Sequence, residues 1–253
     1  MNEQLCEQLR NLHLVGFIHA IQEQSESLQH YQELTFEERL GFLVQKECMR
    51  RDNKRLIGRL KSARLKQSAT IDQIDFSIAR GLQKKKFLEL AQLEWVQQHH
   101  NLTIIGPTGV GKSFLACTLG DKACKNGLAV RYFKTSALIS ALLSAKADGS
   151  FPRLSANLAK VDLLIIDEWL REPLSEANAR EILDLLDDRY RKSSTIFATQ
   201  FPVADWYQLI KEPTLAEAIL DRVVHDSLRL ELKGESMRKL TSKVQPFTET
   251  FAV

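Results

Sequence analysis

Eight residues near the middle of the chain have the types and spacing needed to hold a polyphosphate. Residues 106–113 read GPTGVGKS, with glycine at the first and sixth positions, then lysine and serine. Glycines let backbone N–H groups turn inward and surround an anion without a Cβ in the way. An apolar run precedes the loop and a helical pattern follows it, so a helix dipole adds to the attraction. The pattern predicts a phosphate-binding loop.

Two side chains of this loop suit particular parts of a nucleotide. Lys112 supplies a point charge to the β- and γ-phosphates, and the Ser113 hydroxyl can join a Mg²⁺ shell that keeps several waters. We therefore expect ATP and Mg²⁺ as cofactors. The expected nucleotide contacts are Gly106, Pro107, Thr108, Gly109, Val110, Gly111, Lys112, Ser113 and Phe114.

A second apolar run, LLIIDE at residues 163–168, ends in two carboxylates. We expect a buried strand in which Asp167 holds the Mg²⁺ through water and Glu168 polarises the attacking water. The alternative is a pair of acidic residues that cap the following helix. The position after a phosphate loop favours the metal and the general base.

A third apolar run, STIFATQ at residues 194–200, ends in polar side chains. Thr199 and Gln200 could position the lytic water beside the γ-phosphate. Ordinary polarity at a strand end is the alternative interpretation.

The elements that must position these residues alternate between strand and helix patterns. Near-continuous apolar strands separated by helices imply a mostly parallel sheet covered on both faces. The sequence predicts an α/β fold with five strands, at residues 102–106, 128–134, 161–167, 194–199 and 227–232.

The N-terminal part of the chain reads as helical and has a divided charge. Thr35 and Glu38 have the spacing of a capping box. Residues 1–45 carry two arginines against seven glutamates, a net charge of −5, whereas residues 46–66 carry nine Lys and Arg against two acidic residues, a net of +7. We predict an N-terminal helical domain over residues 1–68 and a nucleotide-binding domain over residues 69–253, with a polar hinge near the boundary.

The basic helix at residues 46–66 is a candidate for DNA contact. Clustered Lys and Arg can neutralise phosphates and release counterions, and without a base-reading motif the binding should be largely non-specific. The alternative is a solvated helix face that keeps the helical domain soluble. A second candidate lies within residues 135–160. The expected contacts are Arg50, Arg51, Lys54, Arg55, Arg59, Lys61, Arg64 and Lys66 in the first segment, and Lys146, Arg153 and Lys160 in the second.

Other features of the composition narrow the class of protein. The four cysteines show no metal-ligand spacing, which suits reduced thiols in the cytosol. No apolar run reaches the ~18 residues that a membrane span needs. We expect a cytoplasmic protein with no membrane partner.

Together these motifs resemble those of the AAA+ ATPases. More narrowly, the chain is similar to the IstB-like transposition helper ATPases of bacterial insertion sequences, whose near relatives are replicative-helicase loaders. The resemblance spans most of the chain, and ILDRVVH followed by GESMRK narrows the choice. One departure is that the fourth strand ends in Ala198, Thr199 and Gln200, where the family usually has Thr-Ser-Asn.

The resemblance implies further residues and partners. Arg222 would match an arginine finger that reaches a neighbouring subunit's γ-phosphate, with Arg189 and Arg191 as competitors, and Arg238 would match the second sensor arginine. It implies an ATPase that forms a homo-oligomeric ring or spiral on duplex DNA and recruits or activates a transposase. The alternative is a helicase loader acting on single-stranded DNA. A small-molecule kinase is the third hypothesis. Glu168 next to Asp167 and the arginine candidates named above argue against it.

Overall fold

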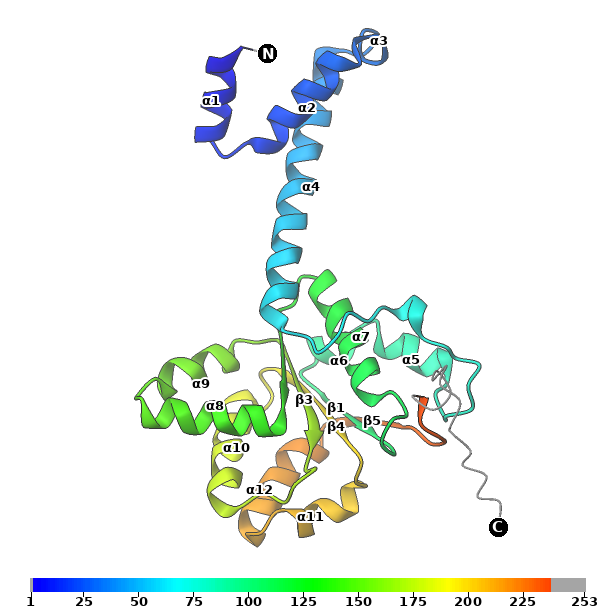
Figure 1. Ribbon diagram of the computed structural model, residues 1–253, viewed down its shortest axis with the longest axis vertical. Coiled ribbons are helices and arrows are strands. Elements are labelled where there is room, and N and C mark those ends of the chain that lie inside the picture. The colour runs from blue at the N-terminus through cyan, green and yellow to red at the C-terminus, as the bar shows by residue number, and fades with distance from the viewer. Residues whose placement is uncertain (1, 238–253) are drawn as a thin grey trace, which may run out of the picture. The chain divides into compact units, whose positions relative to one another are not determined.

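The computed structural model describes residues 2–237 of the 253-residue chain (Figure 1). Contacts within the chain divide it into two compact units, Met1–Gly58 and Arg59–Val253. The predicted boundary between residues 68 and 69 stays a prediction. Within the described residues, no helix combines the length and the apolar character that crossing a bilayer requires.

The first unit consists of helices, as the sequence predicts. They are α1 (Glu3–Asn11), α2 (Val15–Glu26), α3 (Leu28–Tyr31) and the larger part of α4 (Phe36–Ala63). The capping box at the start of α4 is confirmed, because Thr35 N donates to Glu38 Oε2 at 2.7 Å and Glu38 N donates to Thr35 Oγ1 at 3.3 Å. Cys6, Leu9 and Ile18 form a small apolar core.

A buried carboxylate, Glu47, joins α2 to α4 within this unit. Glu47 accepts hydrogen bonds from Gly16 N at 2.6 Å, Arg50 Nη2 at 2.6 Å and Arg51 Nε at 2.7 Å. The bond from Arg50 is the largest cause that lowers the pKa of Glu47 to about 2, against the opposing effect of burial. Two arginines of the predicted DNA contacts therefore donate to a carboxylate of their own chain.

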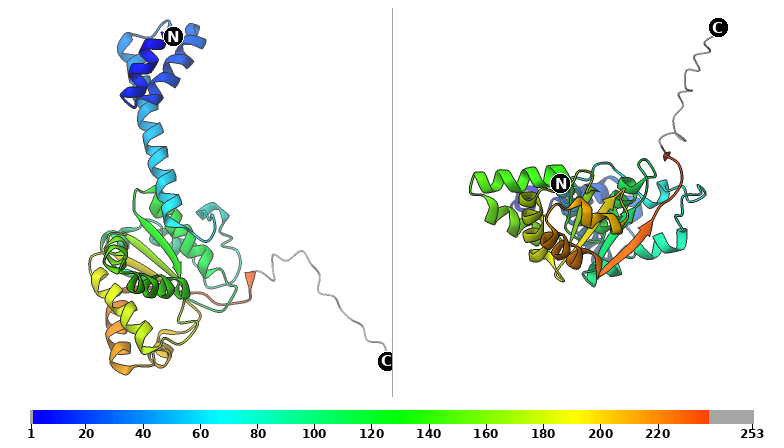
Figure 2. Two further views of the ribbon diagram at one scale, coloured as in Figure 1. Left: turned by 60° about the vertical axis from the view of Figure 1, so that its left-hand side comes forward. Right: turned by 90° about the horizontal axis from the view of Figure 1, so that it is seen from below.

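The second unit is built on a five-stranded sheet, seen between helices in Figures 1 and 2. Its strand order is β2-β3-β4-β1-β5, and all four strand pairs are parallel. The predicted five strands are confirmed, and the sheet is parallel throughout rather than mostly so. The strands are β1 (Asn101–Ile105), β2 (Val130–Lys134), β3 (Leu163–Trp169), β4 (Ser194–Thr199) and β5 (Ser227–Glu231).

Helices cover both faces of this sheet. On one face α7 approaches so closely that a Cβ on Gly120 would lie 2.8 Å from Ile165 Cδ1. The helical segments on the two sides of Leu93 are separate, because Leu93 has φ +65°. The helices of this unit are α5 (Lys84–Leu90), α6 (Glu94–Gln97), α7 (Lys112–Lys125), α8 (Thr135–Ala147), α9 (Phe151–Ala159), α10 (Glu176–Arg189), α11 (Trp206–Leu209) and α12 (Pro213–Val224), with short 3-10 turns at Ile71–Gln73 and Val203–Asp205.

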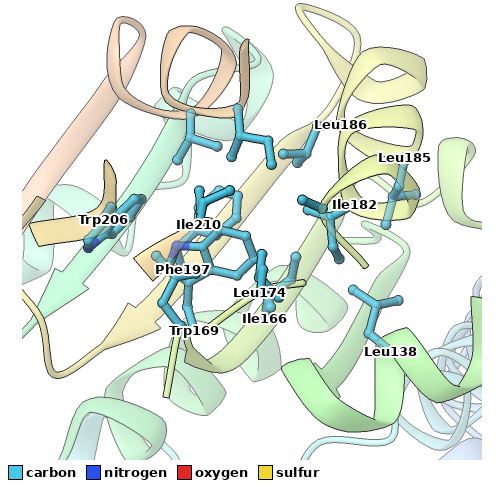
Figure 3. Close-up of a cluster of buried hydrophobic side chains, with 14 of the residues drawn as sticks. Leu138, Ile166, Trp169, Leu174, Ile182, Leu185, Leu186, Phe197, Trp206 and Ile210 are labelled. Atoms are coloured by element: carbon cyan, nitrogen blue, oxygen red, sulfur yellow. The ribbon is translucent and has the colours of Figure 1, made fainter. Parts of the chain in front are cut away.

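The opposite face carries the main apolar core, drawn in Figure 3. Trp169 of β3 belongs to this core, with its ring centroid 5.1 Å from that of Phe197 and 5.9 Å from that of Trp206. Leu138 of α8 and Ile182 of α10 belong to the same buried cluster. This core fixes the ends of β3 and β4, where the candidate catalytic side chains lie.

Arg189, at the end of α10, is a buried structural residue. Its guanidinium donates to the carbonyl oxygens of Leu158 at 2.5 Å, Val161 at 2.8 Å and Ser194 at 2.6 Å. Burial lowers its pKa to about 10, so it stays charged at neutral pH. The expectation that Arg189 competes for the arginine-finger role is wrong. The residue is only 2% exposed, and its guanidinium N–H groups donate to main-chain oxygens of the same chain.

Substituting Arg189 should therefore test stability. Arg189→Ala removes a buried guanidinium that donates to three main-chain carbonyl oxygens, and we expect the free energy of unfolding to fall by about 3 kcal/mol or more. Urea titration followed by tryptophan fluorescence measures this loss. The control is Arg191→Ala, an exposed neighbour, for which we expect a change within about 0.5 kcal/mol. Equal effects of the two substitutions would contradict this account.

Candidate nucleotide-binding site

A cleft of about 880 Å³ lies at the carboxyl edge of the sheet. Parallel strands end together at one edge, which is where open α/β sheets bind their ligands. The segment that precedes β1 also contributes to the cleft. Its lining residues are Lys66, Gln67, Gln73, Ile74, Asp75, Ile78, Arg80, Thr108, Gly109, Gly111, Lys112, Ser113, Phe114, Asp167, Glu168, Trp169, Arg171, Ala198, Thr199, Gln200 and Met237.

The glycine-rich loop joins β1 to α7, as predicted. Gly111 precedes the first helical residue and has φ +100°, a left-handed conformation that L side chains rarely adopt. A Cβ at this position would also lie 2.7 Å from Arg80 Nη1. Only glycine fits both the backbone conformation and the space, so the loop can present its backbone N–H groups to an anion.

The side chain of Lys112 lies along this loop. Its Nζ donates to the carbonyl oxygens of Gly106 at 2.7 Å and Pro107 at 2.8 Å. Burial lowers the pKa of Lys112, and the negative charge of Asp167 opposes that effect. The loop thus holds a partly desolvated positive charge next to its backbone N–H groups.

A bulge in β3 brings two successive carboxylates to the cleft. Ile166 pairs with Phe197 and Trp169 pairs with Thr199, so two residues of β3 stand opposite one residue of β4. Successive side chains of a regular strand point to opposite faces, and a bulge changes their direction. Glu168 takes φ +58° to make it. Asp167 and Glu168 both line the cleft as a result.

Asp167 is held almost completely out of water, at 2% exposure. Its Oδ2 accepts a hydrogen bond from the Tyr132 hydroxyl at 2.6 Å, and its Oδ1 accepts from Glu168 N at 2.9 Å. Burial raises the pKa of Tyr132, and the bond to Asp167 adds to the rise, so the tyrosine keeps its proton. These donors fix the direction of the carboxylate.

Glu168 is paired with two cations. Lys134 Nζ lies 3.0 Å from Glu168 Oε1, and Arg171 Nη1 lies 3.1 Å from Glu168 Oε2. Burial raises the pKa of Glu168, but the hydrogen bonds from Lys134 and Arg171 outweigh it, so the pKa lies below its usual value. Glu168 is therefore ionised at neutral pH.

The end of β4 supplies two residues with different surroundings. The Thr199 hydroxyl is buried, donates to the Trp169 carbonyl oxygen at 2.8 Å and accepts from Phe201 N at 3.2 Å. Gln200 is exposed, and its Oε1 accepts from the Thr108 hydroxyl at 2.9 Å. Thr199 thus ties β4 to β3, whereas Gln200 contacts the phosphate loop directly.

Sequence reasoning missed Arg80, a buried cation at the cleft. Arg80 Nη1 donates to Val110 O at 3.1 Å, Nη2 donates to Asp75 O at 3.2 Å, and Nε has no hydrogen-bond partner within residues 2–237. Reasoning from the sequence also missed Tyr132 and Lys134. Their spacing of two residues on a predicted strand was the available signal, but the pairing of β2 with β3 was not known.

Two arginines assigned from the family resemblance are placed differently. Arg222 lies near the start of β1, away from the phosphate loop, where its main-chain oxygen accepts from Asn101 Nδ2 at 3.2 Å and its side chain pairs with Asp187. Its side chain is 29% exposed. Arg238 lies outside the described residues. Arg191, the remaining competitor, is exposed and 3.5 Å from Asp226.

The predicted DNA contacts fall into two groups. Some donate hydrogen bonds to partners of their own chain: Arg50 and Arg51 to Glu47, Arg59 to the Cys124 carbonyl, and Lys146 to Glu181. Lys66 forms an ion pair with Asp167 at 3.6 Å. Others have exposed side chains, Arg55 with a long 3.4 Å contact to Asp52. The exposed group is Lys54, Arg55, Lys61, Arg64, Arg153 and Lys160.

The residues present fit a magnesium ion that is bound together with phosphates. Mg²⁺ prefers oxygen ligands, keeps several waters and typically takes one or two carboxylates from the protein. The Ser113 hydroxyl and the fixed Asp167 carboxylate line one cleft. Within residues 2–237, no group of three or more His, Cys, Asp or Glu could hold a metal without other ligands.

Comparison with solved structures identifies the fold as that of AAA+ P-loop NTPases. AMPPCP-bound DnaA from Aquifex aeolicus matches with a TM-score of 0.55 at 18% identity, over 69% of this chain and 53% of that chain. DnaI matches with a TM-score of 0.55 at 19% identity, over 65% of this chain and 90% of the DnaI chain. The DnaC helicase loader matches with a TM-score of 0.50 at 21% identity, over 68% and 97%.

Sequence comparison narrows the class to one family. The family model described as IstB-like ATP binding protein matches residues 7–245, and the chain belongs to this family. An insertion sequence ATP-binding protein of Sinorhizobium fredii is 40% identical over 238 residues, which cover 92% of this chain and 95% of the relative. The IS21 ATP-binding protein of Pseudomonas aeruginosa is 36% identical over 236 residues, covering 93% and 88%.

The demand for glycine at position 111 gives a prediction. Gly111→Ala should cost about 1–2 kcal/mol of backbone strain and push Arg80 aside, and we expect it to abolish binding of a fluorescent ATP analogue. The control is Gly127→Ala, which has φ +90° but nothing within 4 Å of the added Cβ. It should carry a similar strain and keep nucleotide binding. Normal nucleotide affinity in Gly111→Ala would refute the steric argument.

Proposed function

We propose that this protein is an ATPase that acts as a DNA-binding helper of transposition for an insertion sequence. One observation carries the proposal: a single cleft contains the phosphate loop, Asp167 and the ionised Glu168. These are the parts that phosphoryl transfer from ATP to water requires, namely an anion cradle, a metal ligand and a general base.

Each residue has a separate role in the proposed reaction. Backbone N–H groups of the loop and Lys112 bind the β- and γ-phosphates, and Ser113 and Asp167 would hold Mg²⁺, which neutralises phosphate charge when bound. Glu168 orients and polarises the attacking water. Its lowered pKa keeps the carboxylate ionised at neutral pH, as a general base requires.

Four further residues complete the proposal. Gln200 is the candidate for sensing the γ-phosphate, because it already contacts the loop at Thr108. Thr199 supports Gln200, because its hydroxyl donates to the Trp169 carbonyl oxygen of β3 and so fixes the end of β4. Arg222 acts in trans as the arginine finger, with Arg238 as the second sensor, so that ATP joins neighbouring subunits of a homo-oligomer.

The proposed partners are duplex DNA and a transposase. Support comes from the relatives, which are named as ATP-binding proteins of insertion sequences. The exposed basic residues are the candidates for non-specific phosphate contacts, and we place the activity in the cytoplasm. The alternative of a helicase loader has only a likeness of fold in its favour, because DnaI and DnaC are 19% and 21% identical to this chain.

Two substitutions separate binding from hydrolysis. Lys112→Ala removes the charge facing the phosphates and should weaken ATP binding on the order of 10- to 100-fold. Glu168→Gln keeps the size of the side chain but removes the base, so ATP should bind normally while turnover falls on the order of 10²- to 10⁴-fold. Equilibrium binding and phosphate release measure the two effects. Hydrolysis at the wild-type rate in Glu168→Gln would show that another group is the base.

Assembly on DNA tests the proposed partner and the finger. Light scattering after size exclusion should find a large species only with ATP and duplex DNA, and not with ADP or with single-stranded DNA. Arg222→Ala should assemble but lose hydrolysis on the order of 10³-fold. Arg191→Ala, at the remaining competitor for the finger role, should assemble and hydrolyse ATP at the wild-type rate. Assembly on single-stranded DNA together with a replicative helicase would favour the loader instead.

A further inference from the structure

The end of α4 and the residues that follow it are held within the second unit. Arg59 Nε donates to the Cys124 carbonyl oxygen at 2.8 Å, and Arg131 Nη1 donates to the Ser62 carbonyl oxygen at 2.7 Å. Ala63 and Ala69 are completely buried. The backbone is therefore held on both sides of Lys66, and the side chain of this lysine starts from a defined position.

The ammonium group of Lys66 reaches the cleft. Lys66 Nζ lies 3.6 Å from Asp167 Oδ2, and its side chain is 32% exposed. Lys66 lines the cleft together with Lys112 and Ser113. From the sequence, Lys66 is the last residue of the predicted DNA-binding stretch, but its charged end lies in the nucleotide site.

Within residues 2–237, Lys66 is the only cation that forms an ion pair with Asp167, and the charge of Lys112 acts on this carboxylate from a greater distance. The carboxylate is buried, and its hydrogen-bond donors, the Tyr132 hydroxyl and the Glu168 backbone N–H, carry no net charge. A buried carboxylate is stabilised by a nearby cation. Lys66 supplies such a cation in an ion pair, at the carboxylate that the proposed function assigns to the metal.

We infer that Lys66 is a further residue of the metal site, which competes with the divalent cation for Asp167 and so sets the metal concentration that the site requires. This inference rests on the proposed function. Two positive charges a few ångströms from one carboxylate repel each other, and in a partly desolvated cleft water screens that repulsion incompletely. The metal must therefore bind against the charge of Lys66 or displace it from Asp167.

A direct role in phosphate binding has the opposite signature. If Lys66 bound the polyphosphate as Lys112 does, its removal would weaken nucleotide binding at every metal concentration. If Lys66 competes with the metal, its removal lowers the metal concentration at which nucleotide binding is half-saturated. The nucleotide affinity at saturating metal then stays the same or becomes higher.

The experiment measures binding of a fluorescent, non-hydrolysable ATP analogue to the full chain while Mg²⁺ is titrated. For Lys66→Gln we expect the half-saturating Mg²⁺ concentration to fall on the order of three- to tenfold. Lys66→Arg keeps the charge and should stay within about twofold of wild type. The matched control is Lys61→Gln, which removes the same charge at an exposed position of α4. Its half-saturating Mg²⁺ concentration should also stay within about twofold of wild type. Mn²⁺ binding in the presence of the analogue, followed by electron paramagnetic resonance, gives a second readout.

Two outcomes overturn the inference. Identical Mg²⁺ dependence in Lys66→Gln and Lys61→Gln shows that Lys66 does not act on the metal, and weaker analogue binding at saturating Mg²⁺ shows that it acts on phosphate. Lys66→Ala serves the same test if the glutamine variant does not fold. Failure of the wild-type chain to bind the analogue defeats the proposed function itself, a result distinct from failure of the Lys66 effect alone.

Discussion

The site depends on the cost of keeping charged groups out of water at the carboxyl edge of the sheet. Asp167 is buried, and Lys112 is partly desolvated at the loop beside it. Neither charge is stable alone in such surroundings, so each must be close to a group of opposite sign or to strong hydrogen-bond partners. Tyr132, Lys66 and the loop carbonyls perform this task. The same arrangement is suited to a polyphosphate with a divalent cation, which brings both signs of charge at once.

Backbone geometry sets where these charges can stand. The bulge at the end of β3 turns Asp167 and Glu168 toward one cleft, and the left-handed conformation of Glu168 costs about 1 kcal/mol. The apolar core under the bulge, where Trp169 packs on Phe197 and Trp206, holds this strained end in place. Strain at this position is consistent with function, because positioned side chains need a rigid support.

The features that follow from local sequence could be predicted, and those that depend on distant contacts could not. The phosphate loop, the five strands and the Thr35–Glu38 cap each depend on residues close together in the chain, and all appear in the structure. The bulge depends on the register between β3 and β4. Arg189 has charged neighbours in sequence that suggest a surface helix, but its partners Leu158 and Val161 lie about 30 residues away. Arg80 was missed for the same reason, because nothing near it in sequence points to Val110.

Calorimetric titration of the purified chain with ATP in the presence of Mg²⁺ tests the central claim most directly. Burying a polyphosphate among the loop amides and Lys112 should give a saturable heat with one nucleotide bound per chain, and omission of Mg²⁺ should weaken the binding. AMP, which lacks the β- and γ-phosphates, should give little heat. A chain that is folded by circular dichroism and yet shows no saturable heat with ATP and Mg²⁺ would contradict the account.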